Sequence, residues 1–269
     1  MKRHIFSYSI DKVAPYIDWS YFLHAWGIAG AKESPQAKEL MEDARTMLKG
    51  FGSRYTIQAI FALCDAKSEG DNIIIEGTPL PFLRQQHCIP GTYNLCLSDF
   101  VSPRGDKVGL FATSVESELV KEYDNDEYLG LIAQILADRL AEATATLLHK
   151  QVRTDSKLWG YTPNETLTLE DMFAEKHQGI RPAVGYPSMP DQSIIFTIDK
   201  LLNLNEAGIT LTPNGAMTPH ASVCGIMIAH PAARYFAVGK IDKKQLNDYA
   251  ERRGMPAEEI AKFLSKNIG

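Results

Sequence analysis

The chain has 269 residues, 45% of them hydrophobic and 23% charged, which is typical of a globular protein with a sizeable core. Its formal net charge of -5 argues against a nucleic-acid partner, because nucleic-acid-binding proteins usually carry a clustered basic excess. The N-terminal residues are too polar for a signal peptide, and no stretch has the length of a membrane span. We therefore expect a cytoplasmic protein without a membrane partner.

The cysteines give no sign of a metal site or a disulfide framework. They are Cys64, Cys88, Cys96 and Cys224. They form no CxxC pair and stand near no HxxxH motif, the spacings that would indicate zinc. We predict buried free thiols and no bound metal.

Residues 34–50 predict the first helix. Ser34 is the expected N-cap, and Pro35 stands in the first turn, where its missing N–H costs nothing. Apolar side chains recur on one face of this segment up to Gly50, which we expect to close the helix.

Three strands are predicted after this helix. Residues 55–64 and 73–76 are rich in β-branched and apolar side chains. They flank a turn at residues 69–72, so we expect them to pair. Residues 108–114 predict a third strand.

The longest predicted helix covers about residues 125–155, where apolar side chains recur at steps of three or four. Residues 137–143 place acids among small side chains, so another part of the chain can approach there, and Glu142 is a candidate for that contact. Thr168 and Asp171 resemble a capping box that starts a further short helix.

Residues 177–191 contain two glycines and three prolines, a composition that favours an extended, constrained loop over a helix or a central strand. Arg181 precedes a proline, which biases its backbone toward an extended conformation, and Gly185 permits a turn. A guanidinium on a stiff loop is suited to bidentate capture of a carboxylate. The alternative for Arg181 is an ion pair with a structural acid.

The next segments predict a helix over residues 194–204 and an antiparallel hairpin. The hairpin is expected to join residues 222–229 and 235–241 around a turn at 230–233.

Two more helices are expected near the C-terminus. Asp242 caps the first, which stops at Gly254, and Pro256 opens the second. Strands joined by hairpins and separated by grouped helices indicate an antiparallel α+β fold, with one domain over residues 1–269. Neither GxGxxG nor GxxxxGK[ST] occurs, so the common nucleotide fingerprints are absent.

The run from Glu175 to Asp191 contains the pattern RPAxGYPxxPD. Residues 16–22 are similar to IDWxxFF, residues 83–86 read LRQQ, residues 97–103 are similar to LxDFVAP, and residues 137–143 read ADRLAEA. In their motifs and in the order of those motifs, these segments resemble the reactivation domain of cobalamin-dependent methionine synthase, which binds S-adenosylmethionine and has the signature RPAxGYPxxPDH. The resemblance covers roughly residues 14–269.

The resemblance implies a C-shaped α+β domain with a twisted antiparallel sheet flanked by helices. It also implies a groove for S-adenosylmethionine between the sheet edge and the proline-rich loop. Carried over by position, the ligand-binding residues are Asp18, Glu142, Glu175, Arg181, Tyr235 and Phe236. Their chemistry agrees, because carboxylates can receive an ammonium and ribose hydroxyls, a guanidinium can pair a carboxylate, and aromatic rings can face adenine or a sulfonium.

Each of these residues has a purely structural alternative. Asp18 could simply cap a helix, Glu142 could be a surface acid, and either Tyr235 or Phe236 could belong to the core of a strand. The resemblance gives Tyr186 a separate role, facing the cobalamin of a partner, with stacking on neighbouring prolines as the alternative. His149 and His220 are assigned no chemistry.

The implied function is support of the reductive methylation of cob(II)alamin, which rescues an inactivated methionine synthase. S-adenosylmethionine supplies the methyl group, a flavodoxin-type donor the electron, and a partner protein the cobalamin; no side chain of this chain is expected to act as a catalytic residue. The sequence contains no DxHxxG cobalamin segment and no cysteine cluster for a homocysteine site, so we expect action in trans. The alternatives are a reactivator of another corrinoid protein and an interaction module that has lost the ligand.

Two departures from the family pattern concern partner docking. Gln192 replaces the histidine that usually ends the signature, and Thr218, Pro219 and His220 replace a tryptophan-proline-glycine stretch.

Overall fold

The computed structural model describes residues 1–28, 34–52, 54–87 and 91–269. Its strands are β1 (Lys2–Ser9), β2 (Thr56–Glu69), β3 (Asn72–Ile75), β4 (Thr78–Pro81), β5 (Asp106–Val115), β6 (Thr210–Leu211), β7 (Met217–Thr218) and β8 (Ser222–Met227). Its α-helices are α1 (Ile10–Val13), α2 (Trp19–Ala25), α3 (Pro35–Phe51), α4 (Glu118–Lys121), α5 (Glu127–Thr154), α6 (Leu169–Phe173), α7 (Ile195–Leu202), α8 (Lys243–Arg253) and α9 (Ala257–Phe263). Short 3-10 helices cover Ala14–Tyr16, Leu97–Phe100, Gln192–Ile194 and Leu204–Ala207.

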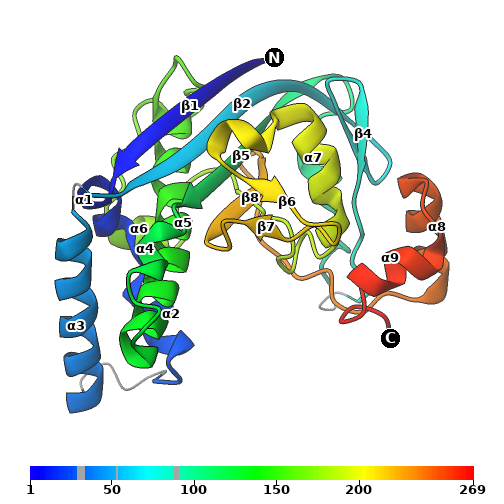
Figure 1. Cartoon of the computed structure of the whole chain (residues 1–269). Coiled ribbons are helices and arrows are strands. Elements are labelled where there is room, and N and C mark those ends of the chain that lie inside the picture. The colour runs from blue at the N-terminus through cyan, green and yellow to red at the C-terminus, as the bar shows by residue number, and fades with distance from the viewer. Residues whose placement is uncertain (29–33, 53, 88–90) are drawn as a thin grey trace.

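The main sheet is antiparallel and is built around the long strand β2. Its order is β4-β3-β2-β5-β8, and β1 pairs with the first half of β2 on the edge that β3 uses further along. Figure 1 shows β1 and β2 running over the top of the molecule, with α3 and α5 at one end of the arch and α8 and α9 at the other. The predicted C-shaped α+β arrangement with a twisted antiparallel sheet is therefore confirmed.

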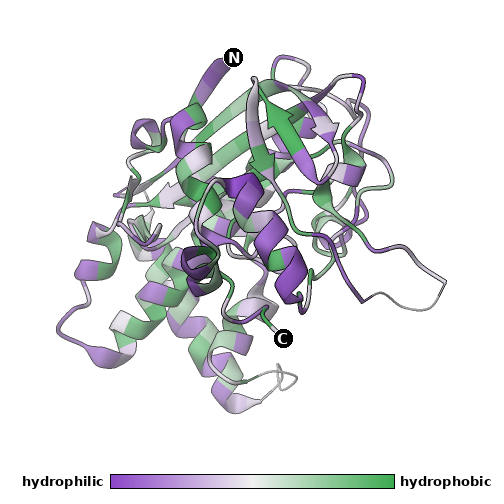
Figure 2. Ribbon diagram, turned by 90° about the vertical axis from the view of Figure 1, so that its right-hand side faces the viewer, coloured by the Kyte–Doolittle hydropathy of each residue, from purple (hydrophilic) through white to green (hydrophobic). Residues whose placement is uncertain are grey.

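The central strands are covered on both faces. Phe61 and Phe111 point into the cluster formed with α3 and α5, whereas Ile60 and Leu110 point into the cluster formed with α7. This alternation follows from the two-residue period of a strand, and it explains why β2 and β5 read as nearly continuous apolar runs. Figure 2 shows the same pattern, with hydrophobic central strands and helices that are hydrophilic on part of their surface.

Most predicted helices are confirmed, because their ends carry local signals. Ser34 accepts a hydrogen bond from the backbone N–H of Ala37 and caps α3. The capping box at Thr168, α5, α8 and α9 also lie where the sequence predicts them. The predicted end of α3 was wrong by two residues, since Gly50 lies inside the helix and Gly52 is the C-cap.

The strands of the main sheet were predicted only in part. The paired strands β2 and β3 and the third strand β5 are confirmed. Strands β1 and β4 were not predicted, although Phe6 and Tyr8 in β1 alternate with serines as a strand requires. Whether β1 and β4 form strands depends on pairing with β2 and β3, and the residues of these two segments alone do not show that pairing.

The predicted loop at residues 177–191 is confirmed, and it lies along the edge of β8 that β5 leaves free. Ile180 exchanges both backbone hydrogen bonds with Ile228, at 2.9 Å each. The carbonyl oxygen of Pro182 accepts a bond of 3.0 Å from the N–H of Ile226. The loop thus acts as an additional edge segment of the sheet.

This pairing explains why the predicted hairpin was wrong. Residues 235–241 form no strand in the part of the chain that the structure describes, because the loop already occupies the edge of β8 that the hairpin would need. Side chains hold the segment in place instead. The amide of Gln85 donates to the carbonyl oxygen of Ala237 at 2.8 Å, and that of Gln86 accepts from the N–H of Asp242.

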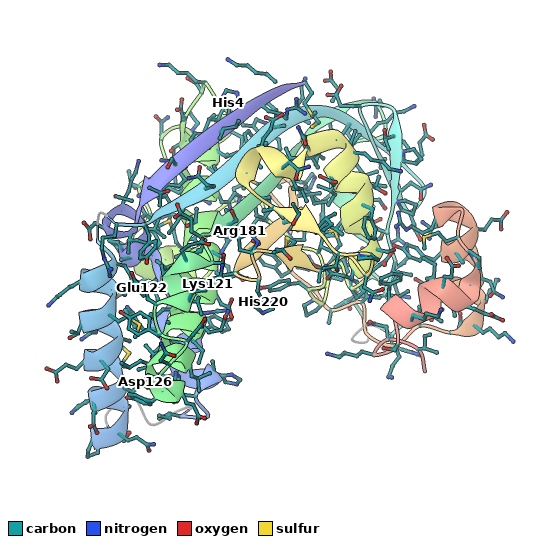
Figure 3. All side chains as sticks on the ribbon, in the orientation of Figure 1. His4, Lys121, Glu122, Asp126, Arg181 and His220 are labelled. Atoms are coloured by element: carbon teal, nitrogen blue, oxygen red, sulfur yellow. The ribbon has the colours of Figure 1, made fainter. Side chains whose placement is uncertain are left out.

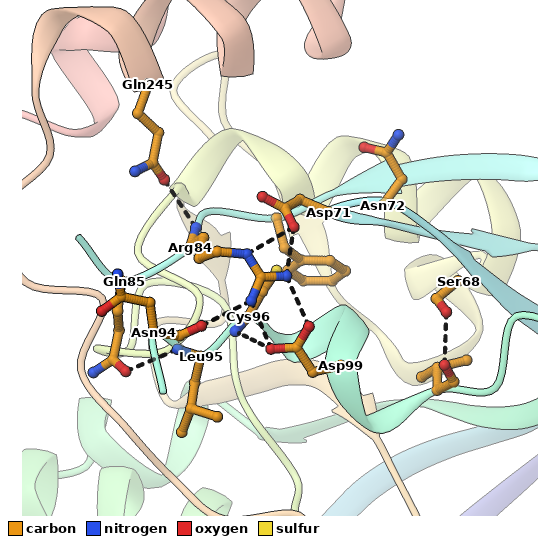
Figure 4. A network of polar contacts seen from close by, with 12 residues as sticks. Ser68, Asp71, Asn72, Arg84, Gln85, Asn94, Leu95, Cys96, Asp99 and Gln245 are labelled. Atoms are coloured by element: carbon orange, nitrogen blue, oxygen red, sulfur yellow. Dashed lines mark hydrogen bonds and ion pairs between the residues drawn. The ribbon is translucent and has the colours of Figure 1, made fainter. Parts of the chain in front are cut away.

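Arg84, beside these two glutamines, anchors the same region (Figure 4). Its guanidinium bonds Asp71 at 2.6 Å and Asp99 at 2.7 Å, and its backbone N–H donates to Gln245 of α8 at 2.8 Å. The two carboxylates and the arginine are each about one-third exposed, so the network orients the chain more than it stabilises the fold.

The described cysteines, Cys64, Cys96 and Cys224, are buried free thiols, as predicted. Cys88 lies outside the described residues.

Gly225 tests the role of the loop pairing. A Cβ atom at this position would lie 2.2 Å from the Pro182 carbonyl oxygen and 2.8 Å from the Ala183 Cα atom. We expect Gly225→Ala to lower the free energy of unfolding in urea by about 1–3 kcal/mol, because the loop must shift off β8.

The matched control is Gly50→Ala, whose Cβ has no neighbour closer than 3.9 Å and which lies in a helix. It should raise the unfolding free energy by up to about 1 kcal/mol. A loss at Gly50 equal to that at Gly225 would contradict the argument.

Candidate functional site

A groove of about 420 Å³ lies between α5, the loop at 177–191 and the segment that follows β8. This volume is in the usual range for a small-molecule site. All seven residues singled out from the sequence line it: Asp18, Glu142, Glu175, Arg181, Tyr186, Tyr235 and Phe236. They come from parts of the chain more than two hundred residues apart, and the fold brings them together.

Arg181 lies beside β8, because its neighbours Ile180 and Pro182 bond the backbone of Ile228 and Ile226, and it is labelled near the centre of the view in Figure 3. Its backbone N–H donates to the Tyr235 hydroxyl oxygen at 2.9 Å, and its Nη2 donates to the Thr146 hydroxyl oxygen of α5 at 2.9 Å. Among the described residues no carboxylate lies within the 4.0 Å that defines an ion pair with this guanidinium. Within the part of the chain that the structure describes, the alternative of a permanent structural ion pair is therefore wrong, and most donors of this cation have no carboxylate partner there.

Asp18 is a helix cap that also lies at the groove. It caps α2 by accepting a 2.9 Å hydrogen bond from the N–H of Ser20, and it lines the groove. Glu142 accepts a hydrogen bond from the Tyr186 hydroxyl, so α5 is indeed approached by another part of the chain at this acid.

Glu175 has an unusual backbone for a glutamate. It follows the C-cap of α6 with a φ of 55°, in the left-handed region where glycine is the favoured residue. Desolvation raises the pKa of its carboxyl group, and the positive charge of Arg181 opposes that shift. Glu175 therefore combines a backbone conformation that favours glycine with a carboxyl group close enough to Arg181 to be affected by its charge.

Aromatic rings form much of the remaining wall. Tyr235 contributes its ring and also anchors Arg181 through its hydroxyl, whose pKa is raised by burial. Tyr186 is 46% exposed, and Tyr21 and Phe173 are exposed as well, so the mouth of the groove is apolar and open to solvent.

Sequence reasoning missed several lining residues. Tyr16 and Tyr21 belong to the 16–22 segment, so a signal for them was present. Thr146 and Phe173 gave no signal, because a threonine and a phenylalanine on helices usually belong to the fold alone. His149 and His220, to which the sequence assigned no chemistry, do not line the groove. His149 is buried, with its Nε2 atom 2.9 Å from the Tyr161 hydroxyl oxygen, and His220 is exposed.

The arrangement suits a zwitterionic ligand with a flat ring. The guanidinium can hold a carboxylate bidentately, the three acids can accept from an amine or from hydroxyl groups, and the rings can stack on a planar group or face a cation. Among the described residues there is no cluster of three or more histidine, cysteine or acidic side chains that could hold a metal ion. No helix in the described parts of the chain is long and apolar enough to cross a membrane.

The backbone of Glu175 predicts a conflict between stability and function. We expect Glu175→Gly to raise the free energy of unfolding by up to about 1 kcal/mol, because glycine adopts a positive φ without strain. Urea denaturation measures this change. Glu170→Gly, on the exposed side of the same short helix, is the control and should lower stability by about 1 kcal/mol; a loss at both sites would refute the strain argument.

Comparison with known proteins agrees with this geometry. The family model described as vitamin B12 dependent methionine synthase, activation domain, matches residues 9–254. A crystal structure of the MetH reactivation domain bound to AdoHcy is 35% identical, with 100% of this chain and 91% of that chain covered and a TM-score of 0.91. The predicted resemblance and the activation-domain-like fold are thereby confirmed. The chain belongs to the family of activation domains of vitamin B12-dependent methionine synthases.

Proposed function

We propose that the groove binds S-adenosylmethionine. The observation that carries this proposal is the half-buried guanidinium of Arg181, unpaired among the described residues, in one groove with Asp18, Glu142 and Glu175. The ligand's carboxylate would pair with Arg181, and its ammonium and ribose hydroxyls would bind the acids. The adenine and the sulfonium would face Tyr235 and Phe236. AdoHcy, which differs from this ligand by the transferred methyl group, is bound in the related crystal structure.

We further propose that the chain supports reductive methylation of cob(II)alamin on a partner, in trans. When the partner docks, one electron from a flavodoxin-type donor and the methyl group of S-adenosylmethionine would convert its cob(II)alamin into methylcobalamin, with S-adenosylhomocysteine released as the leaving group. The contribution of this chain is proximity and orientation, since it holds the ligand beneath an apolar mouth that the partner can cover. Tyr186, exposed at that mouth and bonded to Glu142, is the residue proposed to face the cobalamin.

A second candidate is reactivation of a different corrinoid protein. The departures from the family pattern favour it, because one of them, Gln192, directly follows the loop that carries Tyr186. The side chain of Gln192 donates to the carbonyl oxygen of Gly215 at 2.8 Å, so it serves the protein's own structure. His220 is exposed and free to take part in a contact with a partner of altered surface.

Binding is tested by titration calorimetry with S-adenosylmethionine. We expect Arg181→Ala to weaken binding by about 10- to 100-fold, the usual cost of losing a charge-assisted hydrogen-bonded pair. Arg104→Ala, at an exposed arginine outside the groove, should leave the affinity unchanged. Absence of any binding heat from the unmodified chain would support the reading that the ligand has been lost.

Reactivation is tested spectroscopically. The purified chain is mixed with a methionine synthase fragment that carries cob(II)alamin but lacks an activation domain, together with S-adenosylmethionine and reduced flavodoxin. We expect the cob(II)alamin absorption to be replaced by that of methylcobalamin, and Tyr186→Ala to slow this change without abolishing ligand binding. If the ligand binds but no methylcobalamin forms, another corrinoid protein becomes the favoured partner.

A further inference from the structure

Thr146 occupies a special position on α5. Its hydroxyl group donates to the carbonyl oxygen of Glu142, four residues earlier, at 3.1 Å and accepts from Nη2 of Arg181 at 2.9 Å. The residue is 8% exposed and lines the groove. It therefore connects the helix that carries one proposed ligand-binding acid with the cation on the opposite wall.

The direction of these two hydrogen bonds is fixed by chemistry. A guanidinium has only donors, so the threonine oxygen must be the acceptor of the bond from Arg181. The hydroxyl proton is then directed to the backbone carbonyl of Glu142, a common arrangement for a threonine inside a helix. Because α5 is long and packed against the sheet, the accepting lone pair has a fixed position in the groove.

Arg181 is thus held at two points. Tyr235 fixes its backbone, and Thr146 fixes the end of its side chain. Both side chains line the groove, and the Coulomb attraction between Arg181 and Glu175 opposes the rise that desolvation gives the Glu175 pKa. Without the second point, this attraction would draw the guanidinium onto that acid. A guanidinium paired in this way would no longer be available for a ligand carboxylate.

We propose that Thr146 is a positioning residue that keeps the Arg181 guanidinium free and aimed at the carboxylate of the bound ligand. This inference rests on the proposed binding of S-adenosylmethionine and assigns Thr146 no contact with the reacting groups. It concerns the carboxylate end of the ligand alone. An analogue that lacks the carboxylate, decarboxylated S-adenosylmethionine, is therefore the discriminating probe.

The test compares three variants by titration calorimetry with both ligands. Thr146→Val keeps the shape and removes the hydroxyl, and we expect it to weaken S-adenosylmethionine binding by about 3- to 10-fold while leaving the decarboxylated ligand unaffected. Thr146→Ser keeps the hydroxyl and should restore the affinity. Thr144→Val is the control, because Thr144 makes the same kind of bond, to the Leu140 carbonyl oxygen, outside the groove.

The outcomes separate this inference from the proposed function. If the unmodified chain binds neither ligand, both fail. If it binds S-adenosylmethionine and Thr146→Val binds it equally well, or loses both ligands alike, the positioning role is wrong and the proposed function stands. In an Arg181→Ala background Thr146→Val should cause no further loss; an additional loss would show that Thr146 acts independently of Arg181.

Discussion

The backbone hydrogen bonds between residues 180–184 and β8 are the contact on which the site depends. They are possible because Gly225 has no side chain, so the loop can lie against the strand with its Pro182 carbonyl oxygen close to the glycine. Pro182 and an extended backbone make this segment stiff before it pairs, which lowers the entropy lost when it is ordered. Arg181 is in the middle of the paired segment, and its position is therefore set by the sheet.

The same contact arranges the rest of the groove. Because the loop occupies the edge of β8, the chain after β8 cannot return as a strand and passes over the loop instead. There Tyr235 meets the backbone of Arg181, and Gln85 and Gln86 hold the segment from the other side. The 83–86 segment, far from the groove in sequence, thus contributes by placing aromatic residues rather than by touching a ligand.

Local signals in the sequence were sufficient for the helices. Caps such as Ser34 and Asp242 and the apolar face of α5 depend only on neighbouring residues, so their positions could be predicted. Strands β1 and β4 and the wrongly predicted hairpin depend on which segment occupies each edge of the sheet. Several segments can compete for one edge, and local patterns in the sequence do not decide between them. Gly50 was misread because a glycine inside a helix looks like a helix end.

The residues of the site also fall into those that the sequence could indicate and those that only the folded chain reveals. The residues alone pointed to Arg181 and Glu142, and the family resemblance supplied the other positions. Neither could indicate Thr146, because its role exists only once the loop lies opposite α5. The groove retains two features that a purely structural surface would lose: a positive φ at a glutamate, and a guanidinium without a carboxylate partner among the described residues. Both cost stability, and both are typical of a binding site prepared for its ligand.

The most direct test of this account is a crystal structure of the chain grown with S-adenosylmethionine. We expect the ligand in the groove, with its carboxylate on the Arg181 guanidinium and its sulfonium methyl group directed toward the mouth beside Tyr186. A ligand bound elsewhere, or an Arg181 side chain turned onto Glu175 while the ligand is present, would contradict it.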